Sequence, residues 1–256
     1  MPIDKIRLRF PDDLEHAFRE DYFSKSLNQL RFSVVLGAAL YALFGVLDSW
    51  IFPEVQHETW IVRYAIVIPA CAALVLFSFS TQFKKYMQAA VFVVVVVAGA
   101  GIVAMMVIVR SPVNYFHFAG LLLIIMYSYN FSKLRFVYTC LSSWSVVIIY
   151  EIAALGIIHA PLPVFLNDNF FYIAANLIGM FSSYHRELYM RKDFFQNRMV
   201  QELESQKHIF EKETLHEVAE RAIHSFRESE EKFLALADTA AIAIFIHQGE
   251  NFLYAN

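Results

Sequence analysis

The chain has 256 residues, of which 58% are hydrophobic and 16% aromatic, while only 18% carry a charge. This composition lies outside the range of soluble globular proteins and is typical of a membrane protein. The formal net charge of −3 supplies no basic surface for a phosphate backbone, so we expect no nucleic-acid partner. The two cysteines, Cys71 and Cys140, lie in apolar stretches, which excludes a disulfide framework.

The charged residues are distributed unevenly along the chain. Residues 32–185 carry 11 of the 45 charged residues, whereas residues 186–232 carry 20. The chain is therefore predicted to consist of a membrane block followed by a polar block. The N-terminus stays charged up to Arg31 and lacks the apolar core of a secretory signal peptide, so we expect no cleavage.

The apolar residues form stretches long enough to cross a membrane. A bilayer core about 30 Å thick requires roughly 20 apolar residues in a helix. The fourth stretch is short, and it spans only if Phe116 and the Lys133–Arg135 edge lie at the two interfaces. The sequence thus predicts an all-α membrane protein with a six-transmembrane-helix bundle, whose spans are 32–52, 60–80, 89–109, 118–131, 137–158 and 169–189.

Basic residues in the connections predict the orientation of the spans. They occur in the N-terminal segment, in the second and fourth connections and after the sixth span, whereas Arg110 alone lies in the other connections. The positive-inside rule then places both termini in the cytoplasm, in agreement with an even number of spans.

The residues before the first span show a helix pattern. Phe10-Pro11-Asp12-Asp13 is typical of a helix start, and apolar residues follow at roughly helical spacing. Residues 1–31 are predicted to form an amphipathic helix on the inner leaflet, or alternatively a solvated leader that caps the bundle.

The polar block is predicted to be a long helix. Neither Gly nor Pro occurs from Arg186 to Phe245, so a continuous helix is permitted. Leu203 and Phe210 are seven residues apart, and so are Leu215 and Ala222, but the two pairs are out of register. Residues 190–228 are therefore interpreted as a dimeric coiled coil with one discontinuity, the alternative being a solvated single helix.

Two opposite charges lie about one turn inside the first two spans. Asp48 is near the outer end of span one and Arg63 near the start of span two, and only seven residues, Pro53 to Thr59, join the helices. An unpaired charge in a bilayer is costly and marks a functional site by default. We predict that Asp48 and Arg63 form an ion pair, with either a structural or a signalling role.

Two further polar residues are predicted at a depth of about 10 Å from the outer face. They are Glu151 in span five and Asn176 in span six. They either mark a pocket for a small or lipophilic ligand in the outer half of the bundle or hold the two helices together.

Each outward connection contains one histidine, namely His57, His117 and His159. Three imidazoles brought together by short loops would suit a divalent metal such as Zn²⁺ or Cu²⁺ at the outer face. No H-x-x-x-H or H-x-H spacing supports the cluster, so solvated loop histidines are the alternative. A haem is not indicated, because no second intramembrane histidine is available to pair with His185 around it.

The last 28 residues change character again. Glu230-Glu231-Lys232-Phe233 begins a helix pattern, Ile242–His247 and Phe252–Asn256 are predicted strands, and a Gly-containing turn joins them. This pattern resembles the opening of a PAS domain, an α/β fold. Residues 229–256 are thus expected to be a PAS start that is cut before the ligand-binding half.

Several short stretches of the membrane block carry a resemblance, namely Asp13-Leu14-Glu15, Ala17-Phe18, Leu47-Asp48, Arg63, Pro69, Lys133–Phe136, Tyr150-Glu151, Asn169–Phe171, Asn176 and Tyr184. In these stretches the chain resembles the six-helix anchor of bacterial membrane adenylate cyclases and of PAS-linked diguanylate cyclases. The resemblance implies a bacterial inner membrane protein, a homodimer, a sensor domain over 32–189 and a downstream enzyme that makes a cyclic nucleotide such as cyclic di-GMP. It also adds Tyr150 to the candidate signalling residues.

No catalytic motif is present in the chain, which has neither a phosphate-binding loop nor a nucleophile elbow nor an H-E-x-x-H sequence. We expect a sensory input module that passes a signal through span six and the coiled coil. The alternatives are a passive dimerising anchor and a small transporter or channel. Against the latter, the sequence contains no inverted repeat and no pair of broken helices.

Overall fold

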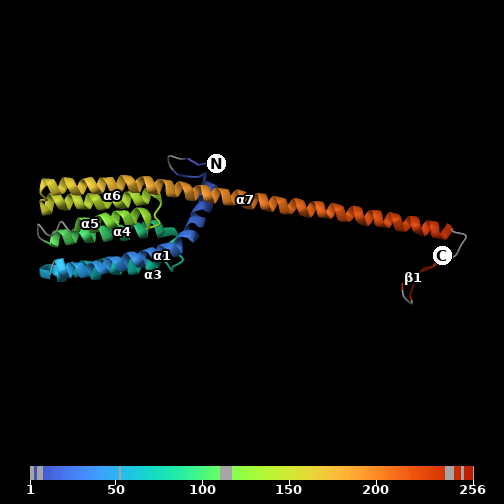
Figure 1. Ribbon diagram of the computed structural model, residues 1–256, viewed down its shortest axis with the longest axis horizontal. Coiled ribbons are helices and arrows are strands. Elements are labelled where there is room, and N and C mark those ends of the chain that lie inside the picture. Colours follow the sequence, from blue (N-terminus) through green and yellow to red (C-terminus); the bar gives the residue numbers. More distant parts are fainter. Residues whose placement is uncertain are drawn as a thin grey trace. The chain divides into compact units, whose positions relative to one another are not determined.

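The computed structural model describes residues 3–4, 8–51, 53–109, 117–239, 245–248 and 251–255. The chain divides into two compact units, Met1–Phe195 and Gln196–Asn256. The first unit is a bundle of long apolar helices (Figure 1). Phe116, which was expected at an interface of the fourth span, lies outside the described residues.

The first helix, α1, runs without interruption from Asp12 to Ile51 and so joins the N-terminal segment to the first span. It begins with acidic residues, as the sequence predicts. The apolar face of its first turns is buried in the unit, where the Phe18 ring lies 5.6 Å from that of Phe194. This face, which was predicted to lie on the inner leaflet, is therefore packed against protein within the unit.

The second helical segment begins earlier than predicted. It consists of η1 (Pro53–Val55), α2 (Gln56–Trp60), the π-helix η2 (Ile61–Val67) and α3 (Ile68–Phe77). The predicted loop Pro53–Thr59 is helical because Pro is accepted in the first turn of a helix. Pro69 follows η2 and has no backbone N–H to donate, so the wider π turns adjoin the position where an ordinary helical bond is lost.

The remaining helices of the first unit are α4 (Phe83–Ile108), α5 (His117–Asn130), α6 (Phe136–Ala153) with its π-helical end η4 (Ala154–Ile158), and the start of α7 (Leu162–Thr239). Five helices in the described residues are long and apolar enough to cross a membrane. The exception is α5, whose 14 residues extend about 21 Å. A six-helix bundle is therefore present, with a short fourth helix.

Helix α4 lies at the centre of the bundle and packs closely against its neighbours. A Cβ atom on Gly99 would lie 2.4 Å from a methyl carbon of Val146 in α6, and one on Gly101 would lie 2.7 Å from Val67. Small residues at such positions allow two helix backbones to approach each other. The Tyr41 hydroxyl of α1 also donates a 3.3 Å hydrogen bond to the carbonyl of Ala98 in α4.

Basic residues from several segments collect at one end of the bundle, here called the basic end. It comprises the start of α1, the α3–α4 turn, the α5–α6 connection and α7 near Arg191. Lys84 lies 2.6 Å from Glu20, and Arg31 donates a 2.7 Å hydrogen bond to the Ser78 carbonyl. The basic segments that the sequence assigns to one side of the membrane therefore do lie at one end of the bundle.

The second unit contains the rest of α7 and two strands. The helix continues to Thr239, in agreement with the absence of Gly and Pro. Strands β1 (Phe245–Gln248) and β2 (Asn251–Ala255) pair antiparallel, with an irregularity in register between Ile246 and His247. Whether this pair begins a PAS domain remains a prediction.

Candidate functional site

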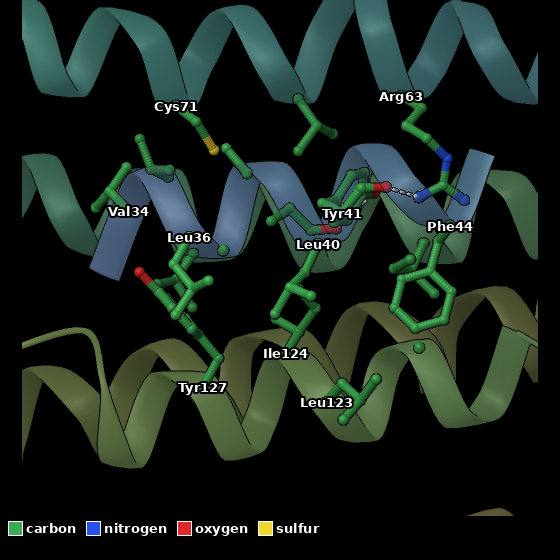
Figure 2. Close-up of a pocket in the computed structure, with 18 of the residues that line it drawn as sticks. Val34, Leu36, Leu40, Tyr41, Phe44, Arg63, Cys71, Leu123, Ile124 and Tyr127 are labelled. Carbon is green, nitrogen blue, oxygen red and sulfur yellow. Dashed lines mark hydrogen bonds between the residues drawn. The ribbon is translucent and has the colours of Figure 1, made fainter. Parts of the chain in front are cut away.

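Asp48 and Arg63 form a buried ion pair between α1 and η2. The Arg63 Nε and Nη2 atoms donate hydrogen bonds of 3.0 and 2.8 Å to the Asp48 Oδ2 atom, and the two side chains are only 2% and 5% exposed. Arg63 Nη1 also donates to the Tyr41 carbonyl at 2.6 Å, as drawn in Figure 2. The predicted pairing is confirmed, and the charges compensate each other at a depth where a single charge would be unfavourable.

A cavity of about 480 Å³ lies beside this ion pair. Its walls come from α1, η2, α3, α4 and α5, and its volume falls in the range of small-molecule sites. Figure 2 shows Leu40 and Phe44 of α1 on one side of it, and Leu123 and Ile124 of α5 on the other.

The charged side chains that line the cavity lie at one end of it. Asp48 is three residues before the end of α1, and His117 is the first residue of α5, so both lie at the end opposite the basic end. Among the described lining residues, Asp48 and Arg63 are the ones with a full charge. The rest of the wall is mainly aliphatic and aromatic, so the cavity fits a molecule with an apolar body and a small polar head.

Tyr150, Glu151 and Asn176 do not line this cavity. Asn176 accepts a 2.9 Å hydrogen bond from the Tyr129 hydroxyl and donates one of 2.8 Å to the Tyr172 carbonyl. Glu151 and Asn176 therefore do not mark the cavity beside the ion pair, although a pocket in the outer half of the bundle was one of the two predictions for them. The Asn176 side chain joins α7 to α5 through the Tyr129 hydroxyl.

A second buried polar contact joins α6 to α7. The Tyr150 hydroxyl donates a 2.8 Å hydrogen bond to the Asp168 carboxylate, and Asp168 is buried. Asp168 belongs to the first turns of α7, not to the loop that the sequence predicted, because the helix begins at Leu162, beside Pro161 and Pro163. Glu151 follows Tyr150 in α6, and its Oε1 atom is buried and accepts no hydrogen bond from the described residues.

The three histidines do not form a metal site. No group of three His, Cys, Asp or Glu side chains in the described residues could hold a metal ion. His117 is buried and lines the cavity, whereas His57 and His159 are exposed. The helical start of the second segment and the inward position of His117 separate the imidazoles that short loops were expected to bring together.

The basic end contains a buried cluster that the sequence does not reveal, here called the Glu15–Arg191 cluster and made of Glu15, Arg135, Glu187 and Arg191. Arg191 is fully buried and lies 2.7 Å from Glu15 and 2.8 Å from Glu187. Arg135 lies 3.1 Å from Glu15 and 3.4 Å from Glu187. Two carboxylates therefore face two largely buried guanidinium groups, and the more exposed Arg19 also lies 3.2 Å from Glu15.

Backbone and aromatic groups complete the Glu15–Arg191 cluster. Glu15 accepts a 3.1 Å hydrogen bond from the Phe10 N–H, and Glu187 accepts one of 2.7 Å from the Phe136 N–H at the start of α6. The Arg191 guanidinium lies 4.2 Å from the centre of the Phe18 ring, a cation–π contact. The cluster thus ties α1, α6 and α7 together.

The cluster keeps Glu15 ionised. Glu15 lies well before the apolar stretch of α1, and burial acts to raise the pKa of its carboxyl group. The hydrogen bond from Arg191 and the one from the Phe10 N–H outweigh this effect, with help from the charges of Arg191 and Arg135, so the pKa is lowered overall. The local signals in the sequence are two spacings of four residues on one helix, Glu15 with Arg19 and Glu187 with Arg191.

No protein-family model matches the chain, and no curated protein resembles it closely enough to establish a relationship.

Proposed function

We propose that the chain is a membrane-integral sensory input module, in which a change in the packing of the bundle is passed through α7 to the second unit and beyond. The observation that carries this proposal is the Glu15–Arg191 cluster together with the continuity of α7. The helix that runs on into the second unit is held by buried charges just before it leaves the bundle.

The path of the signal follows from the position of α1. This helix contributes Leu40 and Phe44 to the cavity wall and Glu15 to the cluster. A displacement of α1 at the cavity would be carried along the helix to Glu15, which contacts Arg191 of α7. Packed helices with two discrete arrangements are the usual elements that couple distant sites.

The second unit supports a signalling role for α7. Leu203, Phe210 and Leu215 are large apolar side chains that are exposed on the helix. In a homodimer they would pair across a coiled coil, and the out-of-register spacing would permit two alignments of similar energy. The resemblance described above suggests that the basic end faces the cytoplasm of a bacterial cell and that the output is synthesis of a cyclic nucleotide.

The test is to weaken the cluster and measure α7 at a distance. Phe210→Cys is introduced after Cys71 and Cys140 are replaced by Ala, and cross-linking between two chains is measured in lipid nanodiscs. We expect Arg191→Gln to change the cross-linking yield about fivefold or more, the low end of allosteric coupling. Arg198→Gln, on the exposed part of the same helix, is the matched control and should change nothing.

If the bundle of Arg191→Gln melts at the original temperature and its cross-linking yield is unchanged, the proposal is contradicted. That result would favour a passive dimerising anchor. If cysteines placed one at a time at positions 199–226 gave no cross-link between two chains, the coiled-coil dimer itself would be contradicted.

A further inference from the structure

The cavity beside Asp48 and Arg63 has the chemistry of a specific binding site for an amphiphile. We infer that it binds a neutral molecule with a long apolar body and a hydroxyl or similar hydrogen-bond donor as its head, which reaches it from the bilayer between α1 and α5. The idea that this molecule is the signal rests on the proposed function. The idea that it binds in the cavity is independent of the proposed function.

The head group is inferred from the unused oxygen of Asp48. Both hydrogen bonds from Arg63 go to Oδ2. Oδ1 accepts none from the residues that the structure describes, although a carboxylate can accept several. Asp48 lines the cavity, so a donor on a bound molecule would supply the missing partner.

The charge of the head is inferred from the balance of the ion pair. Asp48 and Arg63 neutralise each other, and Arg63 Nη1 is already bonded to the Tyr41 carbonyl. A charged head would add an uncompensated charge at bilayer depth, which costs several kcal/mol by the usual insertion scales. A neutral donor avoids this cost and still makes a hydrogen bond to a charged group, which is stronger than one between neutral groups.

The route of access is inferred from residues that belong both to the cavity wall and to the outer surface of the bundle. Leu36, Leu40 and Phe44 on α1 line the cavity and are still 38–51% exposed. Leu123 and Met126 on α5 also line the cavity and are 47% and 51% exposed. The gap between α1 and α5 is therefore bordered by apolar side chains that would face acyl chains, so an amphiphile can enter sideways without crossing water.

The experiment uses a photoreactive dodecanol that carries a diazirine on its chain, with the full chain in nanodiscs. We expect saturable labelling of peptides from α1 and α5, with unlabelled dodecanol competing about tenfold better than its methyl ether, which lacks the donor. Leu40→Trp, which fills the cavity, should abolish saturable labelling. Leu43→Trp, on the same helix but outside the cavity wall, should leave it unchanged.

Equal competition by the alcohol and the ether would overturn the contact with Asp48. Labelling that does not saturate, or that survives Leu40→Trp, would overturn the site. If Leu40→Trp instead dissociates a dimer and no α1 peptide is labelled, a second copy of the chain covers the cavity, and the inference is wrong. None of these outcomes depends on the α7 cross-linking test, so failure of the site and failure of the proposed function are distinguishable.

Discussion

At the scale of single residues, the bundle contains charges that are stable only in pairs. Arg63 donates two hydrogen bonds to Asp48 while both side chains are almost completely buried, and Arg191 is shared by Glu15 and Glu187. Removal of one partner leaves the other charge buried and uncompensated, whereas removal of both leaves only a packing defect. Pairing thus makes each residue depend on a partner from another helix.

The first prediction concerns the buried ion pair. Asp48→Leu alone should destabilise the protein by about 3–5 kcal/mol, because the Arg63 guanidinium loses its counter-charge. The double variant Asp48→Leu/Arg63→Met should recover most of this loss. Thermal unfolding of Asp48→Leu, of Arg63→Met and of the double variant in the same detergent measures the coupling between the two residues. If the effects of the two single variants simply add up, the pair is not the stabilising unit.

At the scale of elements, α7 has two roles along one uninterrupted helix. Its first turns take part in the bundle through Asp168 and Asn176, and its last residues within the bundle belong to the Glu15–Arg191 cluster. From Gln196 onward it belongs to the second unit. A helix transmits rotation or sliding only while its backbone hydrogen bonds are continuous, so the continuity of α7 is a condition of the proposed mechanism.

The second prediction tests that continuity. Met199→Pro lies just beyond the bundle and removes one backbone donor, at a local cost of about 3 kcal/mol. The melting temperature of the bundle should stay unchanged, but Arg191→Gln should no longer alter cross-linking at Phe210→Cys. Met199→Ala preserves the helix and serves as the control. A response that persists in the proline variant would show that the signal reaches the second unit by another route.

At the scale of the whole molecule, the helices have lengths and apolar composition suited to a membrane, and the basic segments lie together at one end of the bundle. The basic end contains the point at which α7 leaves the bundle. With the positive-inside rule, both termini are predicted to be cytoplasmic.

The third prediction is topological. Cysteines at Lys84 and Gln201 should react with a membrane-impermeant maleimide from the same, cytoplasmic side, and a cysteine at Glu58 should react only from the other side. Labelling of intact cells and of inverted vesicles distinguishes the two. Reaction of Lys84→Cys and Gln201→Cys from opposite sides would refute the even number of crossings, and with it the proposed path of the signal.

The sequence by itself determined the features that depend on neighbouring residues. The apolar stretches, the long helix without Gly or Pro, and the pairing of Asp48 with Arg63 across a short connection all follow from local pattern and spacing. Where helix starts were misjudged, at Pro53 and Leu162, the cause was also local, because Pro can belong to the first turn of a helix as well as to a loop.

Only the tertiary structure decided the features that depend on which helices become neighbours. Glu15 and Arg191 are 176 residues apart, and no periodicity identifies them as partners. The cavity between α1 and α5, the separation of the three histidines, and the hydrogen bonds of Asn176 are decided in the same way. The physical reason is that hydropathy acts on each residue separately and determines which segments are buried, whereas ion pairs and cavities depend on the side chains that two separate helices bring to one place.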